Sequence, residues 1–292
     1  MVDFTSNDTN TTTYNDTVYA AIINDDILDA LQAAVVTPPL LAMFDLSGQP
    51  SKAVDIPIAD SESAAAVAEG AELANTALST SKATLTASEV GIMATITDVL
   101  DVSSIAATRG AQMRQMGNAV AQKIDVDICA LLAGFGTAVG GSGAGLSLAN
   151  LFSAIYTLEA ANAPGPYVGV LHPVQIADLR IAVEDSSSGI FTGGGVRSGA
   201  GEIGTTKDTG YFGDFMGIDF YQSTNVPTAN SAADRAGGVF SKDYALGMVP
   251  KWPSKTEIMR WAPIRGFVVV VSSMYGVGEI VDTAGVEITT DA

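Results

Sequence analysis

The residue types that carry acid–base, nucleophilic or metal chemistry are few in this chain and are not spaced as such sites require. His172 is the only histidine, so a catalytic triad or a multi-histidine metal site is excluded within one chain. Asp25, Asp26 and Asp29 do not alternate as the ligands of a calcium loop do. We therefore expect no catalytic, metal-binding or cofactor-binding residues, and a structural role for His172 at the start of a helix.

Two further groups of residues could suggest chemistry but are better explained as loops. Glu69 and Glu72 lie in the small-residue stretch VAEGAE at 67–72, where nothing buries a carboxyl group and raises its pKa as general acid catalysis needs. Contact with a basic residue of a neighbouring subunit, or simple solvation, fits them better. The glycine-rich stretches at 140–145 and 193–195 lack the Gly-Lys-Ser/Thr ending of a phosphate-binding loop, so we expect flexible loops there.

The composition indicates a protein that associates with copies of itself. Of its 292 residues, 47% are hydrophobic and only 16% are charged, below the roughly 25% usual for soluble domains. A soluble protein with so few charges often buries surface against itself. The net charge of −18 disfavours tight nucleic-acid binding, which depends on Lys and Arg, although a container wall can enclose DNA without gripping it. The acidity is equally compatible with solubility or with a saline habitat.

The sequence carries no sign of secretion or membrane insertion. Residues 1–15 are polar and lack the basic and apolar regions of a signal peptide, and no apolar run approaches the roughly twenty residues of a membrane-spanning helix. The single cysteine, Cys129, lies among apolar residues, which favours a buried thiol and excludes an intrachain disulfide. We expect a soluble protein made in a cytoplasm.

The first third of the chain is predicted to contain an arm and a hairpin. Residues 1–20 are rich in Thr, Asn and Asp, which predicts a flexible arm, and a helix is predicted over 20–36, ended by Pro38 and Pro39. Strands are predicted over 53–58 and 84–97. The polar stretch 61–81 between them predicts an extended hairpin, too poor in apolar residues to fold without another surface to lie on.

The remainder reads as α+β. The longest helix is predicted over 103–138, with Asp125 and Asp127 largely off an apolar stripe made of Met113, Met116, Val120, Ile124, Ile128, Leu131 and Phe135. Further helices are predicted over 148–161 and 173–183, and strands over 167–171, 217–221 and 238–240. A Ser/Gly-rich loop over 185–210 and a β-rich region over 256–281 complete the pattern. Trp252 and Trp261 are expected to be packing anchors.

In this order the elements resemble the major capsid proteins of tailed double-stranded DNA phages, which share the Hong Kong 97 fold. The hairpin with VAEGAE at 67–72 resembles the family's extended loop, and the helix through 112–135 resembles its spine helix. VGVLHP at 168–173 before a helix is similar to the start of its axial domain. GIDF at 217–220, NVP at 225–227 and FSKDYALG at 240–247 are similar to its late axial pattern, and YGVGEI at 275–280 to its C-terminal strand.

The resemblance implies an N-terminal arm at 1–50, an extended loop at 51–97, a peripheral domain at 98–166 and 250–292 with the spine helix, and an axial domain at 167–249. It implies a structural protein of the virion, synthesised in the host cytoplasm, whose copies form hexamers and pentamers of an icosahedral shell around double-stranded DNA. It implies no enzyme activity, no cofactor, no membrane and no sequence-specific DNA binding. The residues expected at contacts between subunits are Glu69, Gly70, Glu72, Lys82, Gly193, Gly194 and Gly195.

Departures from the family bear on the expected partners. Some members carry a helical scaffolding segment ahead of the capsid domain, and the chain before Ala53 is too short for one, so we expect a separate scaffolding protein, a portal and a decoration protein. Some members crosslink their subunits, and Lys82 could be a donor, but one lysine makes no motif. Two other functions stay open: an encapsulin-like nanocompartment shell, and an extracellular surface-layer protein, against which the missing signal peptide argues.

Overall fold

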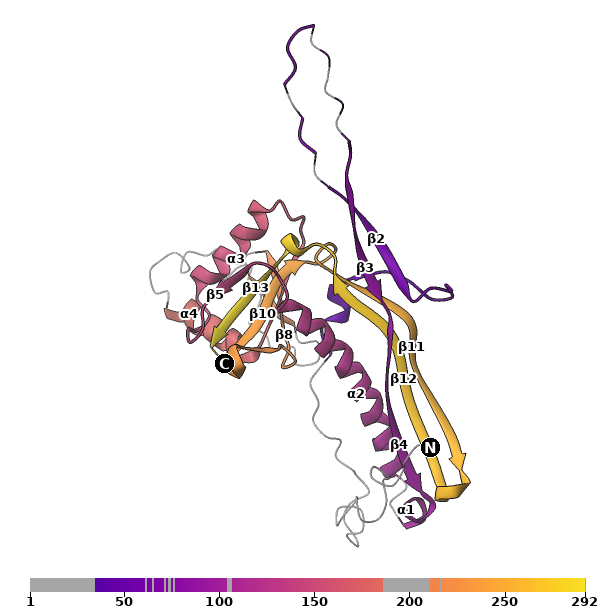
Figure 1. The fold of residues 1–292 in the computed structure, drawn as a ribbon. Helices are drawn as coiled ribbons and strands as arrows, with labels where there is room; N and C mark the ends of the chain where they lie inside the picture. Colours follow the sequence, from indigo (N-terminus) through magenta and orange to yellow (C-terminus); the bar gives the residue numbers. More distant parts are fainter. Residues whose placement is uncertain are drawn as a thin grey trace.

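The computed structural model describes residues 35–60, 62–64, 66–70, 72, 75, 77–103, 107–185, 211–215 and 217–291. In this part of the chain the strands form three sheets, which build a body, a long extension and a projecting hairpin (Figure 1). The arm predicted for 1–20, most of the helix predicted over 20–36 and nearly all of the loop predicted over 185–210 lie outside the described residues. Within the described part, no helix is both long and apolar enough to span a membrane.

A seven-stranded mixed sheet forms the body. Its order is β5–β13–β10–β6–β8–β7, with β9 paired to β10. The strand β6 pairs parallel with β8, whereas β10 runs antiparallel to both β6 and β13. These strands confirm the three predicted for this region, although β10 is longer than expected. Their bounds are β5 Ala138–Gly140, β6 Tyr167–Leu171, β7 Tyr211–Phe215, β8 Ile218–Gln222, β9 Thr228–Ala229, β10 Asp234–Ser241 and β13 Gly285–Asp291.

Helices cover both faces of the body sheet. On one face, α3 (Leu148–Ala160) and α4 (Pro173–Asp185) pack Leu151, Leu158 and Ile176 against Val239 of β10. The hydroxyl of Ser147 accepts a hydrogen bond from the backbone N–H of Asn150 at 3.2 Å, which caps the start of α3. Both helices confirm the predicted ones. The alternation of buried residues along β10 sends Val239 to this face and Phe240 to the other.

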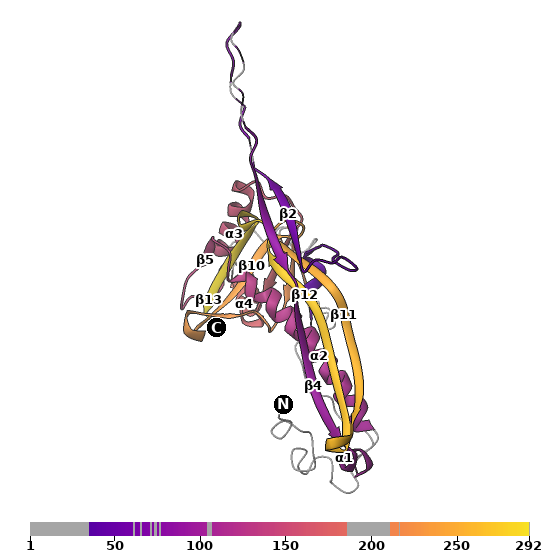
Figure 2. The ribbon, with the colours of Figure 1, turned by 45° about the vertical axis from the view of Figure 1, so that its right-hand side comes forward.

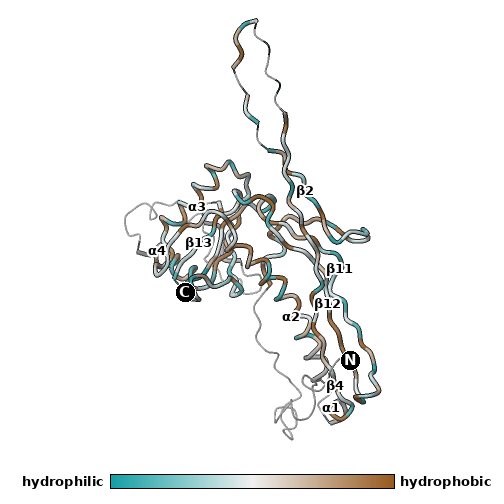
Figure 3. The backbone as a smooth tube through the Cα atoms, in the orientation of Figure 1, coloured by the Kyte–Doolittle hydropathy of each residue, from teal (hydrophilic) through white to brown (hydrophobic). Residues whose placement is uncertain are grey.

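A four-stranded sheet of order β1–β11–β12–β4 forms the extension. Its strands are β1 (Ala42–Met43), β4 (Ser88–Thr97), β11 (Leu246–Trp261) and β12 (Gly266–Glu279). The valine run of β12 lies between β11 and β4 and forms the apolar centre of this sheet (Figure 3). The predicted strand over 84–97 is in fact two strands that meet at Ala87, and the β-rich region begins ten residues earlier than predicted.

The longest helix, α2 (Ala107–Leu132), follows the short α1 (Asp98–Ser103) and lies against both sheets (Figure 1). In its first half, Met116 and Val120 pack on Val269 and Val271 of β12. In its second half, Ile128, Cys129 and Leu132 pack on the body sheet beside Val168, Val170 and Phe240. The apolar stripe from Met113 to Leu131 was therefore predicted correctly, and it joins the extension to the body. The helix predicted over 103–138 ends earlier, at Leu132, so the buried Phe135 follows α2 and is not part of it.

The hairpin of β2 (Ala53–Ala59) and β3 (Thr80–Thr86) projects away from the other sheets (Figure 2). The two strands pair antiparallel from Ala53 with Thr86 to Ala59 with Thr80, as predicted. Single turns of 3-10 helix complete the described elements: η1 Pro38–Leu40, η2 Asn230–Ala232, η3 Ala262–Ile264 and η4 Asp282–Ala284.

The chain passes between the body and the extension more often than the expected segments allow for. The strands β5 and β13 fall within 98–166 and 250–292, the ranges expected for the domain of the long helix, yet both hydrogen-bond within the body sheet. The body and the extension are therefore interleaved along the sequence, and each contains residues from several distant ranges.

Candidate assembly surfaces

The distal part of the hairpin is exposed on all sides. Glu69 and Gly70 form a turn, with Gly70 at φ +81, a left-handed conformation that glycine adopts without strain. Glu72 is also exposed, and the apolar side chains of Val67 and Leu78 are 44% and 81% exposed. Such a segment gains too little from its own contacts to repay the entropy of ordering, so it needs another surface.

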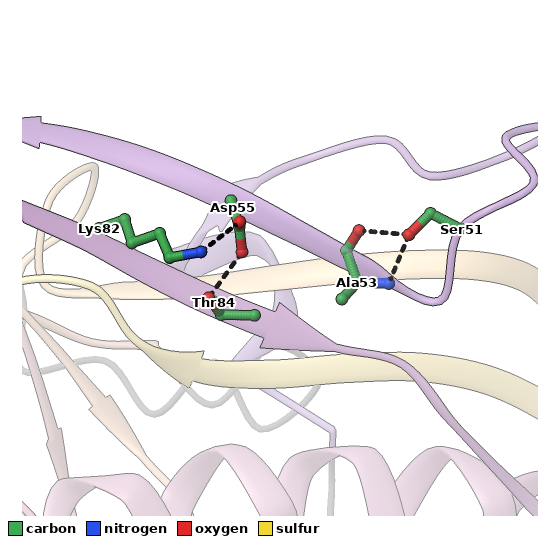
Figure 4. A network of polar contacts seen from close by, with 5 residues as sticks. All are labelled: Ser51, Ala53, Asp55, Lys82 and Thr84. Carbon is green, nitrogen blue, oxygen red and sulfur yellow. Dashed lines mark hydrogen bonds and ion pairs between the residues drawn. The ribbon is translucent and has the colours of Figure 1, made fainter.

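Polar contacts stiffen the base of the hairpin. The ammonium of Lys82 on β3 lies 2.7 Å from the Asp55 carboxylate on β2, and the Thr84 hydroxyl donates to the same carboxylate at 2.6 Å (Figure 4). These hydrogen bonds hold the pKa of the Asp55 carboxyl below its usual value. The Ser51 hydroxyl bonds both the N–H and the carbonyl of Ala53 where β2 begins. Lys82, expected at a subunit contact, is thus already paired within its own chain.

Two glycines let the end of the hairpin cross β12 at close range. A Cβ on Gly276 would lie 2.5 Å from the Thr86 carbonyl oxygen, and one on Gly278 would lie 2.5 Å from Leu85. Leu85 is buried beneath the crossing with Leu46, Val249 and Met274. This close approach explains both glycines of YGVGEI at 275–280 and fixes where the hairpin leaves the sheet.

Lys251 of β11 secures the loop that leads into the hairpin. Its ammonium donates to the carbonyl oxygens of Leu46 at 3.3 Å and Ser51 at 3.0 Å, and also to that of Gln49. One cation therefore satisfies three backbone acceptors of a loop that has little regular structure. Lys251 therefore fixes the loop before the hairpin, and β12 contacts the end of the hairpin.

A buried carboxylate joins three distant parts of the chain. Asp125 of α2 is 0% exposed. One of its oxygens accepts from the N–H groups of Val36 and Thr37 at 2.9 and 2.8 Å. The other accepts from the Ser223 hydroxyl at 3.0 Å and the Asn225 amide at 2.7 Å. A buried ion is tolerated when its hydrogen bonds are complete, so this residue fixes where the N-terminal segment meets the body.

Two carboxyl groups lie together where the chain passes from β12 to β13. Glu279 ends β12, and its carboxyl hydrogen-bonds that of Asp282, which also accepts from the N–H of Gly136 at 2.6 Å. Burial, and next the charge of Asp282, raise the pKa of Glu279 above its usual 4.5. The surroundings of Glu279 therefore favour its protonated form at this junction.

A model of the family described as phage capsid protein matches residues 81–287, which is more than half of the chain. The chain belongs to the phage capsid protein family. It is thus a structural protein of a viral capsid, and neither the nanocompartment nor the surface-layer function is favoured. No curated protein matches the sequence.

Solved capsid structures share the fold of this capsid protein at low identity. The capsid of Cyanophage P-SCSP1u is 20% identical, with 92% of each chain covered and a TM-score of 0.71. A solved structure from Mycobacterium phage Che8 is 21% identical in sequence, with 92% of this chain and 96% of that chain covered and a TM-score of 0.69. The capsid of a native GTA particle is 11% identical over 97% of this chain and all of that one, with a TM-score of 0.65. These likenesses confirm the α+β capsid fold.

The structure places the residues expected at subunit contacts of the capsid protein in different parts of the chain. The structure brings Glu69, Gly70 and Glu72 together on the hairpin, whereas Lys82 lies nearer its base. Gly193, Gly194 and Gly195 lie outside the described residues. His172 is partly buried beside the start of α4, and its ring nitrogen accepts from the Val174 N–H at 3.3 Å. Burial and, less, the charge of Arg235 lower the pKa of this imidazole.

The predictions for Asp125 and Trp252 were wrong. Asp125 was expected largely off the buried stripe of the capsid protein, yet this carboxylate is enclosed. The spacing of three to Ile128 and four to Cys129 was the available signal. Trp252 was expected to be an anchor, but 37% of it is exposed on β11. Cys129 is buried as predicted, and desolvation raises the pKa of its thiol to about 12.

Proposed function

We propose that this capsid protein assembles as hexamers and pentamers into an icosahedral shell that encloses double-stranded DNA. The exposed hairpin carries the proposal, because every described residue from 60 to 82 is exposed. A polar projection of this length is stabilised when it lies across a second copy. Many modest contacts of this kind, repeated by symmetry, can close a shell.

The parts of the fold suit the roles expected from the family. We assign 1–50 to an arm, 51–97 to the extended loop, 98–166 and 250–292 to the peripheral domain and 167–249 to the axial domain. We count β5 and β13 with the axial domain, because they pair within its sheet. The helix α2 acts as the spine.

The contact residues follow from the same assignment. Glu69, Gly70 and Glu72 would meet a neighbouring subunit at the hairpin turn, and Lys82 would meet it nearer the base. Gly193, Gly194 and Gly195 would lie near the axis of the capsomer. The charge of the hairpin favours a basic surface on the neighbour, because its acidic residues outnumber its basic ones.

As a member of a structural family, the protein acts as a wall without catalysis or a cofactor. Its net charge of −18 repels phosphate, which disfavours sequence-specific DNA binding. It is made in the host cytoplasm and ends in the virion. Its partners besides copies of itself are a separate scaffolding protein, a portal and a decoration protein.

Electron cryo-microscopy of the full chain, co-expressed with the scaffolding protein from its own locus, tests the proposal. We expect closed shells of uniform diameter with five-fold and six-fold capsomers. Replacing Glu69 and Glu72 together by Lys should reduce the yield of shells, while the matched change Glu159→Lys on exposed α3 should not. A wild-type chain that stays a monomer with every scaffolding partner would refute the proposal.

A further inference from the structure

The outer edge of β11 is open over most of its length. Along one edge β11 pairs with β12, and along the other it meets β1 at Gly247 and Met248. The Pro250 carbonyl on the same edge also accepts from the Leu46 N–H at 3.4 Å. In the described part of the chain, no strand pairs with that outer edge beyond Pro250, and β11 forms the rim of the extension in both views (Figures 1 and 2). An unpaired strand edge offers a row of N–H and C=O groups to another strand.

The rim combines protective features in its first half with exposed apolar side chains in its second half. Ile258 and Met259 are 56% and 53% exposed, which leaves apolar surface next to the open backbone. Pro253 lacks an N–H group, and a register shift between Trp252 and Lys255 interrupts the ladder, so new pairing would be confined to the far half of β11.

The charged residues in this half of β11 can pair with the same residues of a second copy. Lys255 and Glu257 flank Thr256, and their side chains are 66% and 62% exposed. When two copies of β11 run antiparallel with Thr256 opposite Thr256, each Lys255 lies opposite a Glu257 of the partner subunit. A register that places Lys255 opposite Lys255, or Glu257 opposite Glu257, brings like charges together and is disfavoured.

This pairing also suits the wall of a shell. A two-fold axis that continues a sheet edge to edge stands perpendicular to the sheet, so both copies keep the same face on the same side. One face of the extension is covered by α2, through Met116 and Val120 on Val269 and Val271. Both α2 helices would then lie on one side of the wall.

We propose that β11 pairs antiparallel with β11 of a second copy across a two-fold axis at Thr256, and that this contact joins neighbouring capsomers. The inference rests on the proposed function, the assembly of a shell, and assigns the β11 edge to one contact between capsomers of that shell. Backbone pairing supplies the attraction, and the two reciprocal Lys255–Glu257 contacts select the register.

Charge reversal tests the contact in the full chain. In Lys255→Glu the interface would gather four carboxylates, and in Glu257→Lys four ammonium groups, so capsomers of either variant alone should join at least about tenfold less than wild type. Equimolar mixing of the two separately purified capsomers should restore joining between unlike capsomers, because each variant then meets its complement. Glu159→Lys, an exposed charge reversal on α3, is the control.

The mixing step separates this contact from the pair that Lys255 and Glu257 form within one chain, which mixing cannot repair. Variants that join as wild type does, or a mixture that fails to recover, would overturn the β11 contact while leaving the shell intact. A wild-type chain that forms no shell overturns the proposed function and this inference with it. Unfolding midpoints close to wild type verify that the variants are folded.

Discussion

Asp125 on α2 accepts a hydrogen bond from the hydroxyl of Thr37, 88 residues earlier in the chain, at 2.7 Å. Because the carboxylate is enclosed, its removal leaves several buried donors without an acceptor. Asp125→Ala should lower the free energy of unfolding by at least about 3 kcal/mol, whereas Asp243→Ala on an exposed turn should change it by less than about 0.5 kcal/mol. Urea unfolding of the soluble protein measures both, and similar losses for the two would contradict the role of Asp125.

Hydrogen exchange should show that the same carboxylate anchors the N-terminal segment. Thr37→Val removes one donor from that segment, while Ser223→Ala removes one donor from the body side of the site. We expect faster exchange of the amides at positions 36 and 37 in the first variant and near Asn225 in the second. Equal effects on both segments would mean that the site loosens as a whole.

Lys251 should control the order of the loop before the hairpin. Lys251→Met keeps most of the apolar stem and removes the ammonium that three carbonyls share. We expect a loss of about 1–3 kcal/mol in the free energy of unfolding and faster hydrogen exchange over 46–51. Lys52→Met, an exposed lysine in the same region, is the matched control.

Gly276 should resist even the smallest side chain. Its Cβ would meet the Thr86 carbonyl, a backbone atom that cannot rotate away, so Gly276→Ala should lower the free energy of unfolding by about 1–3 kcal/mol. Gly117 of α2 has nothing within 4 Å of its Cβ position, and Gly117→Ala should raise stability by up to about 1 kcal/mol. Thermal unfolding of both variants measures this difference in sign.

The Glu279–Asp282 pair should make the junction between the sheets sensitive to pH. The folded-state pKa of Glu279 lies above its usual 4.5, so the protonated pair stabilises the fold fully below 4.5, and that stability is lost as the pH rises through the folded pKa. Glu279→Gln keeps a hydrogen-bond donor but cannot ionise. Its advantage over wild type in unfolding free energy should therefore grow as the pH rises, and parallel pH profiles would contradict this expectation.

The spacing of apolar residues in the sequence predicted the helices and strands that bury one side against the core. The stripe of α2 and the strands β6 and β8 were identified because apolar residues recur at helical spacing or form short runs. The first half of β11 escaped prediction, because Pro250 and Pro253 interrupt it. The burial of residues in this half of β11 depends on neighbouring elements, so a local sequence pattern does not predict it.

Individual contacts were harder to predict than elements. A charged residue such as Asp125 is ordinarily solvated, and only the arrival of Thr37 and Asn225 from distant positions makes its burial favourable. The pairing of Lys82 with Asp55 likewise depends on the register of the hairpin. The exposed hairpin itself was predictable, because its polar composition cannot form a core.

The position of β13 inside the body sheet has a consequence for synthesis. This strand follows every other described strand in the chain, yet it lies between β5 and β10 and pairs with both. A nascent chain still held by the ribosome short of β13 therefore leaves β5 detached from its largest sheet and one edge of β10 unpaired. Partly translated chains cannot present the finished body to a growing particle, so incorporation waits until β13 has been made.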